Sequence, residues 1–242
     1  IYKYRSGIMR SFEEYFYGGG LPETLLMKDK RSWISSLFNK IFFGDLVARH
    51  QIRNDFALKL MIRKLAESVK QPTSYNRIAN IVSTAGKKIS VDTVIDYIAY
   101  LRESWLILPF ENLSARLSER ESNKKYYFVD NGLLGLFLID ANTSLLENIV
   151  AISLRKQYED NVFFYNKNIE VDFVVPDDGL AIQVAYSLAD PTTEKRETDA
   201  LMKFNAIMPM RQLIIITKDE EMVIEKDGTV INVLPVWKWL LR

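Results

Sequence analysis

"IEVDFVVPDDGLAIQVAYS", residues 169–187, is the stretch that decides how the C-terminal half of this chain folds. Both of its flanks mix apolar and polar residues and contain β-branched side chains, which is typical of β-strands. The residues between them, 176–179, read Pro-Asp-Asp-Gly and predict a tight turn. Because side chains alternate along a strand, Asp172 and Gln183 should point away from their apolar neighbours and face each other across this hairpin.

The segments around the hairpin complete a regular order of elements. The expected elements are a helix at 144–158, strands at 161–166, 169–175 and 180–187, a helix at 194–207, a strand at 212–219, a hairpin at 221–233 and a Pro-initiated helix at 235–242. This order predicts an α/β domain in which helices cover a mixed sheet.

The composition restricts the classes of function. The chain has 242 residues and a formal net charge of +1, so no overall positive field identifies a nucleic-acid-binding protein. It has no cysteine, which excludes disulfides and thiolate metal sites and suits a reducing cytoplasm. No apolar run approaches the roughly 18 to 20 residues that span a bilayer. We therefore expect a cytoplasmic protein without a membrane segment.

The middle of the chain shows three helical patterns followed by two strand-like runs. The helices are expected at 56–69, 75–83 and 91–105, with Ser74 and Ser90 as N-caps of the second and third. The strand-like runs at 106–110 and 125–130 are separated by a polar insert, residues 111–124. Three helices, a strand, a long polar loop and a strand form the order of a winged helix.

Winged helices often read DNA, but the charge of the third helix argues against that role here. Its inward positions would be Val94, Ile98, Leu101 and Trp105, and its solvent-facing positions Asp92, Asp96, Tyr97, Tyr100 and Glu103. An acidic outer face is repelled by phosphates. We therefore expect this region to pack against protein more than to read DNA.

Basic residues that could still contact nucleic acid lie beside this helix and in the polar insert. The candidates are Lys87, Lys88, Arg120, Lys124 and Lys125, with Arg116 as a further basic residue of the insert. Three glutamates at positions 111, 119 and 121 offset most of that charge, so a solvated loop of mixed charge is the favoured interpretation.

Residues 1–55 read as helices interrupted by "YGGGLPE", residues 17–23. The sequence contains no G-x-x-x-x-G-K-[ST] phosphate loop, so this glycine run is interpreted as a helix-breaking turn. A second turn is predicted at "VDNGLL", residues 129–134, where Asp130 and Asn131 can accept local backbone hydrogen bonds.

The chain's one histidine, His50, lies between Arg49 and Arg53 near the end of a predicted helix. No acid and nucleophile that would make it a catalyst are recognisable nearby, so a surface or capping role is favoured. The two arginines are candidates for acting in trans on a neighbouring nucleotide site, as arginine fingers do.

Several of these motifs together carry a family resemblance. "YGGGLPE", "YYFVDNGLLGLFL", "LLENIVAISLRK", "EVDFVV" and "WKWLL" occur in this order, and the most specific piece is "YFVDNGLL" followed by "ENIVAISL". Over essentially its whole length the chain resembles the C-terminal part of a family of predicted prokaryotic AAA-type ATPases. The start at Ile1, without a methionine, suggests a fragment of such a protein.

The resemblance implies an α+β or α/β fold class and a division into three parts. Residues 1–55 would be the helical tail or lid of an ATPase module that precedes Ile1. Residues 56–130 would form a winged helix-like domain. Residues 131–242 would form a degenerate restriction-endonuclease-like domain with a mixed sheet, of the PD-(D/E)XK type. ATP and Mg²⁺ would belong to the missing module, and no cofactor is expected within this chain.

In a PD-(D/E)XK nuclease two acids hold a divalent metal, usually Mg²⁺, and a lysine positions or activates water. On this resemblance the acids would be Glu147, on the leading helix, and Asp172. Many members of the family read "E-V-K" at the second acid and the lysine, where this chain has Gln183 and Ala185. Gln183 keeps a neutral oxygen but lacks the charge, and Ala185 can neither donate a proton nor stabilise charge. We therefore expect no catalytic residue and no metal site.

The alternative that keeps the chemistry needs a lysine from elsewhere, and Lys167 and Lys195 are the available ones. On the favoured interpretation Glu170, Asp172 and Gln183 instead form the polar face of an edge hairpin.

The function expected from these observations is binding rather than catalysis. The chain would be the C-terminal region of a predicted ATPase, with the upstream ATPase module as its partner in cis. It would bind a protein partner or nucleic acid under control of that module, and it could form an oligomer. The full-length protein would be an ATPase, while this region would not be catalytic. Two alternatives stay open, namely a metal-dependent nuclease with Glu147 and Asp172 as ligands, and a winged-helix DNA-binding regulator.

Overall fold

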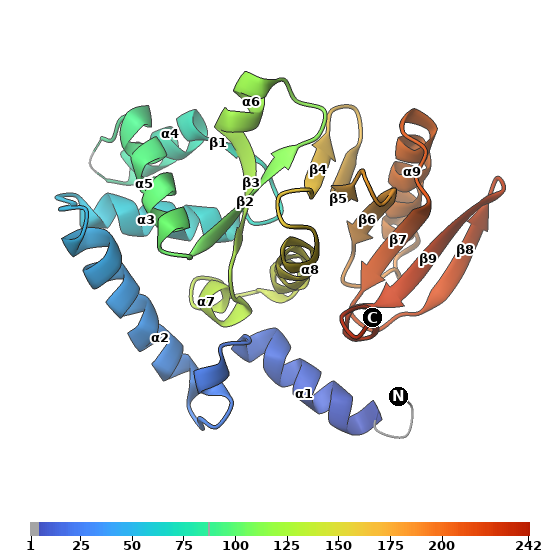
Figure 1. Cartoon of the computed structure of the whole chain (residues 1–242), viewed down its shortest axis with the longest axis horizontal. Coiled ribbons are helices and arrows are strands. Elements are labelled where there is room, and N and C mark those ends of the chain that lie inside the picture. Colours follow the sequence, from blue (N-terminus) through green and yellow to red (C-terminus); the bar gives the residue numbers. More distant parts are fainter. Residues whose placement is uncertain (1–4, 87) are drawn as a thin grey trace. The chain divides into compact units, whose positions relative to one another are not determined.

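The computed structural model describes residues 5–86 and 88–242, and the chain divides into two compact units. Unit 1 comprises Ile1–Pro109 and Glu121–Ala141, and unit 2 comprises Phe110–Arg120 and Asn142–Arg242. Both contain helices and strands, so the chain is an α+β protein with a mixed sheet (Figure 1). The finer division at residues 55 and 130 stays a prediction.

Unit 1 is mainly helical. Its helices are α1 (Arg5–Gly18), the 3₁₀-helix η2 (Pro22–Thr24), α2 (Lys30–Lys40), the π-helix η3 (Ile41–Ala48), α3 (Asp55–Glu67), α4 (Tyr75–Ala85), α5 (Val91–Glu103) and α7 (Asn131–Gly135). The predicted N-caps are confirmed, since Ser74 accepts from the Arg77 N–H at 3.2 Å and Ser90 accepts from the Thr93 N–H at 3.1 Å. None of the helices in the described residues combines the length and apolar character needed to cross a membrane.

Three strands accompany these helices in the order β1 (Thr73–Ser74), β3 (Asn123–Phe128) and β2 (Ile107–Asn112). Strand β1 pairs antiparallel with β3, with Thr73 opposite Lys124. The polar insert was expected to be a loop, but it contains the short helix α6 (Leu117–Ser122) and the end of β2. Five of the six α6 residues are Ser, Glu or Arg and none is buried, which is why its sequence resembles a loop.

Helix α5 confirms the acidic outer face but corrects two aromatic residues. Asp92 and Asp96 are exposed. Tyr97, expected toward solvent, is buried, and its hydroxyl donates to the Asn54 carbonyl at 3.5 Å. Trp105, expected inside, is 76% exposed, because it lies two residues beyond Glu103, the last residue of the helix, and takes a positive φ of 54°.

Unit 2 has the order of elements predicted from the sequence. After α8 (Asn142–Tyr158) come β4 (Phe163–Asn166), β5 (Glu170–Val175), β6 (Leu180–Val184), α9 (Pro191–Ile207), β7 (Gln212–Thr217), β8 (Met222–Lys226), β9 (Thr229–Pro235) and α10 (Val236–Trp239). Strand β6 runs parallel to β7, and β7 parallel to β9, whereas β5–β6 and β8–β9 pair antiparallel. The predicted mixed sheet is therefore confirmed.

The core of unit 2 lies between this sheet and α9. Leu201 and Phe204 of α9 pack in one buried cluster with Ala181 of β6, Ala185 directly after β6 and Ile215 of β7. Figure 1 shows α9 beside the β5 to β7 strands, which it covers. The apolar contacts made by α9 fix the position of the β5–β6 hairpin and of its polar residues.

The expectation of an edge hairpin is wrong. Strand β5 pairs with β4 on its other side, and β6 pairs with β7, so both strands are interior. The pairing of β7 joins residues far apart in the sequence, and the local pattern of the hairpin carries no sign of it. As a result Gln183 is only 4% exposed.

Candidate functional site

The hairpin residues Asp172 and Gln183 lie just beyond the last paired residues of β5 and β6, Phe173 and Ile182. The Gln183 Oε1 atom accepts from the Asp172 N–H at 2.9 Å, and its Nε2 donates to the Glu170 carbonyl at 3.0 Å. In return, the Asp172 Oδ2 atom accepts from the Val184 N–H at 2.9 Å. These three bonds continue the ladder between the strands with side chains. We call Asp172 and Gln183, with these bonds, the hairpin clamp.

The hairpin clamp decides whether these residues can hold a metal. Each of the three bonds uses an atom of a buried or half-buried group, and such groups are costly to leave unpaired. The Gln183 oxygen, which could serve a cation, already accepts from the Asp172 N–H. No group of three potential acidic or imidazole ligands converges anywhere in the described residues. The residues present therefore do not fit the octahedral oxygen shell of Mg²⁺.

The position that the resemblance assigns to the nuclease lysine is apolar. Ala185 is 6% exposed and belongs to the buried cluster that includes Leu201 and Phe204. An ammonium group placed there would be moved from water into an apolar core, which is costly unless it is paired. The alanine is thus part of the packing of α9 on the sheet.

The other acid carried over from the family, Glu147, lies on α8 as expected and is 3% exposed. None of the clamp's three bonds involves it. Lys167, in the turn between β4 and β5, and Lys195, on α9, are both exposed. The structure does not show either lysine bonded to the clamp.

Helix α9 brings a further carboxylate to the clamp that was not identified from the sequence. Glu197 is 6% exposed, and its Oε1 accepts from Nε and Nη2 of Arg196 at 3.0 and 2.6 Å. Burial raises the pKa of Glu197; the Arg196 bond lowers it, and the charges of Asp172 and Glu170 raise it further. The hydrogen bond to Glu197 and the charge of Glu197 raise the pKa of the Arg196 guanidinium, and the charges of Asp172 and Glu170 raise it further. The clamp therefore lies in a net acidic environment with one cation.

The sequence did hold a signal for Glu197. It precedes Leu201 by four residues and Phe204 by seven, which places all three on one face of a helix. That face is the buried one, so a glutamate in phase with it marks a buried acid. The pattern of residues 194–207 predicts a helix, and the buried acid within it was not predicted.

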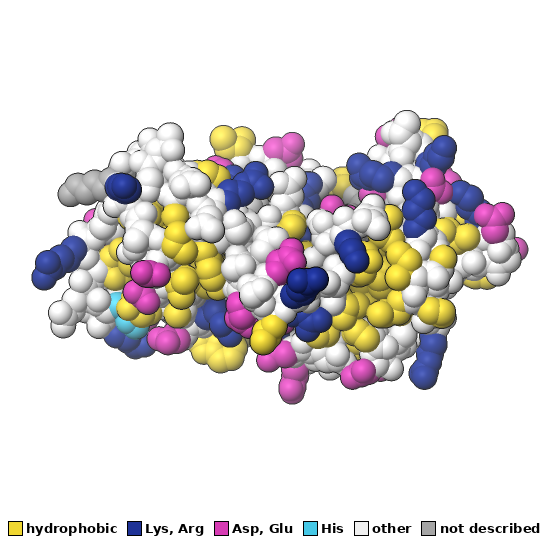
Figure 2. Space-filling model, turned by 90° about the horizontal axis from the view of Figure 1, so that it is seen from above, with side chains coloured by type: hydrophobic (Ala, Val, Ile, Leu, Met, Phe, Trp, Pro, Cys, Tyr) yellow, Lys and Arg dark blue, Asp and Glu magenta, His cyan; other side chains and the backbone are white. Residues whose placement is uncertain are grey.

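Of the basic residues predicted as candidates for contacting nucleic acid, several are not free on the surface as expected. Lys87 lies outside the described residues, and Lys88 is exposed. Arg120 donates to the carbonyls of Ala115 and Leu113 at 3.0 and 2.9 Å, and its guanidinium lies over the Phe163 ring. The hydrogen bonds of Arg120 therefore stabilise the segment between β2 and α6 to which these carbonyls belong. On the face drawn in Figure 2, basic and acidic side chains are interspersed.

Lys124 and Lys125 lie on β3, where the sequence suggested the end of a solvated loop. They are 6% and 0% exposed, and the ammonium of Lys124 pairs with Glu121 at 3.2 Å. A buried ammonium cannot reach a phosphate without opening the strand. Of the five candidates, Lys88 is therefore the one that the structure describes as freely accessible.

The residues around His50 are engaged with one another. The His50 ring stacks on Tyr100 with centroids 3.6 Å apart, and Arg49 pairs with Asp45 at 3.0 Å. Arg53 is exposed. The surface role favoured for His50 agrees with this stacking, while a role of the arginines in trans stays a prediction.

The two turn motifs of the sequence meet in one place. Asp130 caps α7 by accepting from the Gly132 and Leu133 N–H groups at 2.8 and 3.2 Å, which confirms its predicted local role. Its other oxygen accepts from the Gly20 N–H at 2.7 Å, across 110 positions of sequence. Asn131 donates to the Phe16 carbonyl at 2.9 Å, a bond over a long distance in sequence that was not predicted.

We call this junction the glycine lock, and it consists of Gly19, Gly20 and Asp130 with their hydrogen bonds. Position 19 in it has to be a glycine. Its φ is +78°, and a Cβ atom on it would lie 2.1 Å from the Asp130 Oδ1. Such a conformation and such a contact both exclude a side chain. The glycine run is thus a docking point for α7, which the sequence indicated only as a turn.

Comparisons with known proteins place this chain among longer relatives. An uncharacterized protein of Methanocaldococcus jannaschii is 29% identical over 255 residues, covering 98% of this chain and 57% of that protein. An uncharacterized protein of Haemophilus influenzae is 30% identical over 240 residues, covering 96% of this chain and 58% of that protein. The chain thus spans less than two thirds of these relatives. No solved structure matches it.

Two family models match successive parts of the chain. Residues 142–239 match a domain of unknown function, DUF4143, which corresponds to unit 2 apart from the short segment 110–120. Residues 9–145 match a second domain of unknown function, DUF8612, which accounts for more than half of the chain and for most of unit 1. By that match this chain belongs to the DUF8612 family.

Proposed function

We propose that this chain is a partner-binding region, without nuclease activity of its own, in a predicted AAA-type ATPase. The greater length of the curated relatives supports the proposal, since they have room for a further module. ATP and Mg²⁺ belong to that module, and its nucleotide state controls how this region holds its partner. The observation that carries the proposal is the hairpin clamp, in which the former metal-site positions serve as sheet support.

The arrangement of unit 1 supports a winged helix in this proposal. Helices α3, α4 and α5 are followed by β2 and β3, and β1 lies between α3 and α4 in the chain. The strand order β1-β3-β2 matches the small sheet of such a domain, with α6 in the place of the wing. This domain offers an exposed acidic helix face, which suits a protein surface better than a phosphate backbone.

The arrangement of unit 2 supports a degenerate nuclease-like domain. Helix α8 precedes three strands, and α9 and β7 follow them, in the order that the resemblance implies. The clamp explains why that fold persists here without its chemistry. Asp172 and Gln183 hold β5 to β6 where backbone pairing has ended. Ala185 completes the apolar surface under α9.

A cleavage assay tests the absence of nuclease activity. The chain is incubated with Mg²⁺ or Mn²⁺ and with single-stranded and double-stranded DNA and RNA. We expect no cleavage that depends on Asp172. The informative variant is Asp172→Asn, because it removes the charge but keeps an oxygen that can accept from the Val184 N–H. Asp219→Asn, on an exposed residue, is the matched control. Cleavage by the wild-type chain and by the control, but not by Asp172→Asn, would overturn the proposal.

A binding assay separates a protein partner from DNA. We expect no duplex binding at 50 mM salt, where electrostatic binding would be strong. The variant Lys88→Gln removes the accessible basic residue beside α5, and Lys203→Gln, exposed on α9, is its control. Salt-dependent duplex binding that Lys88→Gln weakens and Lys203→Gln does not would favour the DNA-binding regulator instead.

A further inference from the structure

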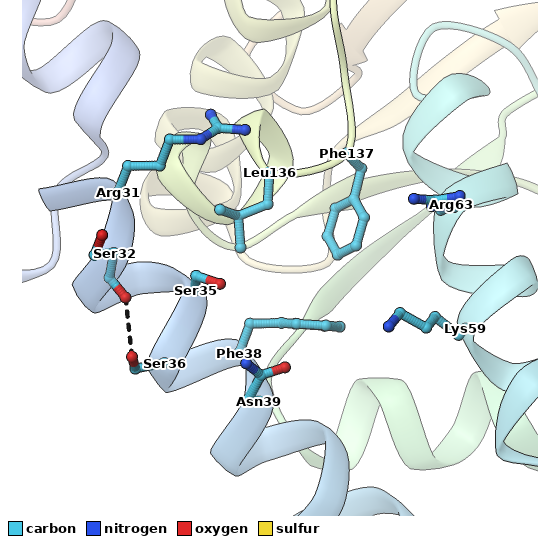
Figure 3. A pocket seen from close by; sticks show the side chains of 10 residues that line it. All are labelled: Arg31, Ser32, Ser35, Ser36, Phe38, Asn39, Lys59, Arg63, Leu136 and Phe137. Atoms are coloured by element: carbon cyan, nitrogen blue, oxygen red, sulfur yellow. Dashed lines mark hydrogen bonds between the residues drawn. The ribbon is translucent and has the colours of Figure 1, made fainter.

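A cavity of about 580 Å³ lies within unit 1, between α2, α3 and the residues that follow α7. Figure 3 shows the side chains that line it. Its volume falls within the roughly 300–1,000 Å³ that is usual for small-molecule sites. None of the proposed functions above uses this cavity, so what it can bind has to be derived from its side chains.

Helix α2 contributes a polar stripe to the cavity. Ser32, Ser35, Ser36 and Asn39 are spaced three and four residues apart, which places them on one face of the helix. Ser32 donates its hydroxyl hydrogen to Asp29, and Ser36 donates to the Ser32 carbonyl. The side chains of Ser35 and Asn39 form no hydrogen bond with any described residue. These two are available to donate to a ligand.

Helix α3 presents two cations to this stripe. Lys59 and Arg63 are four residues apart, and Figure 3 shows both side chains reaching from α3 toward the cavity. The neighbouring positions Leu58 and Ile62 are buried in the core, which fixes the orientation of the helix. The cations are therefore held at the cavity by the packing of α3.

The remaining walls add a third cation and an apolar floor. Arg31 of α2 donates to the Gly135 carbonyl at 3.3 Å, which keeps its guanidinium at the rim near Leu136. Phe38 and Phe137 meet edge to face with centroids 5.1 Å apart, and both rings line the cavity. Aromatic rings in this place can take an apolar or planar part of a ligand.

The charge of the cavity is not compensated by the protein. It is lined by three basic residues and by no acidic one in the described part of the chain, although the whole chain carries only +1. Lys59 and Arg63 form no ion pair with a described residue. Neighbouring cations of the same helices do pair, Lys64 with Glu67 and Lys30 with Glu14. The cavity is therefore locally positive, whereas other basic residues of these helices are paired with acidic ones.

We propose that this cavity binds a small molecule that carries two or more linked phosphate groups. Arginine and lysine donors together with a hydroxyl and an amide match phosphate oxygens, and Arg63 can bind two of them at once. Three cations suit a pyrophosphate group, whose charge exceeds that of a single phosphate. A cavity of this size suits a compact ligand rather than a nucleic-acid duplex. The inference goes beyond the proposed function and does not depend on it.

Isothermal titration of the chain with pyrophosphate, without divalent cations and at 50 mM salt, tests the proposal. We expect saturable binding that Lys59→Gln/Arg63→Gln weakens ten-fold or more. Both side chains are exposed, so the double variant should fold, and its thermal unfolding checks this. Lys40→Gln, at an exposed position of α2 outside the cavity, is the matched control and should leave binding unchanged. Binding should also weaken at 200 mM salt.

Two further titrations identify the source of the phosphates. Tighter binding of adenosine diphosphate than of pyrophosphate would assign the aromatic floor to a nucleotide base, while equal binding would assign the site to the phosphate chain alone. Either result supports the proposal. Three results would overturn it: no binding of pyrophosphate, equal affinity for orthophosphate, or binding that the double variant leaves intact. Stronger binding of a DNA duplex that the double variant abolishes would also overturn it, in favour of a nucleic-acid surface.

Discussion

Replacing Gln183 by glutamate restores the second acid of the nuclease pattern and tests what this position does. In the wild type, Nε2 of Gln183 donates to the Glu170 carbonyl and Oε1 accepts from the Asp172 N–H. A glutamate keeps the acceptor and loses the donor when it is ionised. It also places a negative charge beside Asp172, at a position that is 4% exposed.

The expected loss of stability follows from these contacts. Losing this part-buried hydrogen bond costs about 1 kcal/mol, and placing a negative charge at the buried position 183 beside Asp172 adds about 1–3 kcal/mol. We therefore expect Gln183→Glu to lower the free energy of unfolding of unit 2 by about 2–4 kcal/mol at pH 7. Burial and the nearby carboxylates should raise the pKa of the new carboxyl group. A protonated glutamate can donate to Glu170, so the loss should be small at pH 5 and should grow as the pH rises.

Urea unfolding monitored by tryptophan fluorescence measures this change. Trp237 and Trp239 are buried on α10 of unit 2, and replacing Trp33 and Trp105 of unit 1 by phenylalanine leaves the signal to unit 2. Gln212→Glu makes the same chemical change at an exposed position of β7, where we expect a shift of at most about 0.5 kcal/mol.

Two results would refute the clamp. A loss below about 1 kcal/mol at pH 7 would mean that the bonds of Gln183 contribute little beyond an ordinary hydrogen bond. Recovery of stability on adding millimolar Mg²⁺ would mean that the restored acid completes a metal site, because a ligand stabilises the state that binds it. In that case these residues would still be arranged as a metal site, which the amide of Gln183 leaves incomplete.

The remaining predictions concern the glycine lock and the buried acid of α9. Asp130→Ala removes the side chain that accepts from three backbone N–H groups, and it should lower the free energy of chemical unfolding by about 2–4 kcal/mol. Asp130→Asn should lower it less, and equal losses for the two variants would contradict this. Gly19→Ala should lower the free energy of unfolding by about 3 kcal/mol in the wild-type background. In the Asp130→Ala background it should cost only about 1 kcal/mol, because the clash with the Asp130 carboxylate is then gone, and equal costs in both backgrounds would contradict this. Glu197→Gln should raise the melting temperature near pH 8. Its pKa is raised, so the native glutamate contributes stability only at low pH, and the gap should close toward pH 4; a gap independent of pH would contradict the burial argument.

The local features of the fold could be predicted from the sequence because they are encoded locally. The N-cap serines at 74 and 90, the alternation in β5 and β6 and the Pro-Asp-Asp-Gly turn each act within a few residues, and each lies where it was expected. The facing of Asp172 and Gln183 followed from the same alternation. Even the buried Glu197 had a helical spacing that could have revealed it.

The features that sequence reasoning missed depend on contacts over long distances. Strand β7 turns the hairpin into interior strands, and nothing in residues 169–187 specifies that neighbour. Asp130 could be identified as a cap, but its bond to Gly20 requires α1 and α7 to meet. Trp105 was assigned inward by periodicity, which fails where the helix has ended. The types of the elements could be predicted from the sequence, but the pairing of distant strands and the exact ends of helices could not.

Gln183 and Ala185 depend on each other physically. An ionised acid at position 183 would stand beside Asp172 and within the field of the buried Glu197, and it would need a cation. The nearby cation is Arg196, which is already bonded to Glu197. A lysine at 185 could supply the charge, but that position packs under α9. Once 185 is apolar, a neutral amide at 183 is therefore the residue that satisfies both strands without adding charge. On the nuclease-like fold that we propose for unit 2, the loss of the lysine and the loss of the acid would form one change, from a site that holds a cation to a clamp that supports the sheet.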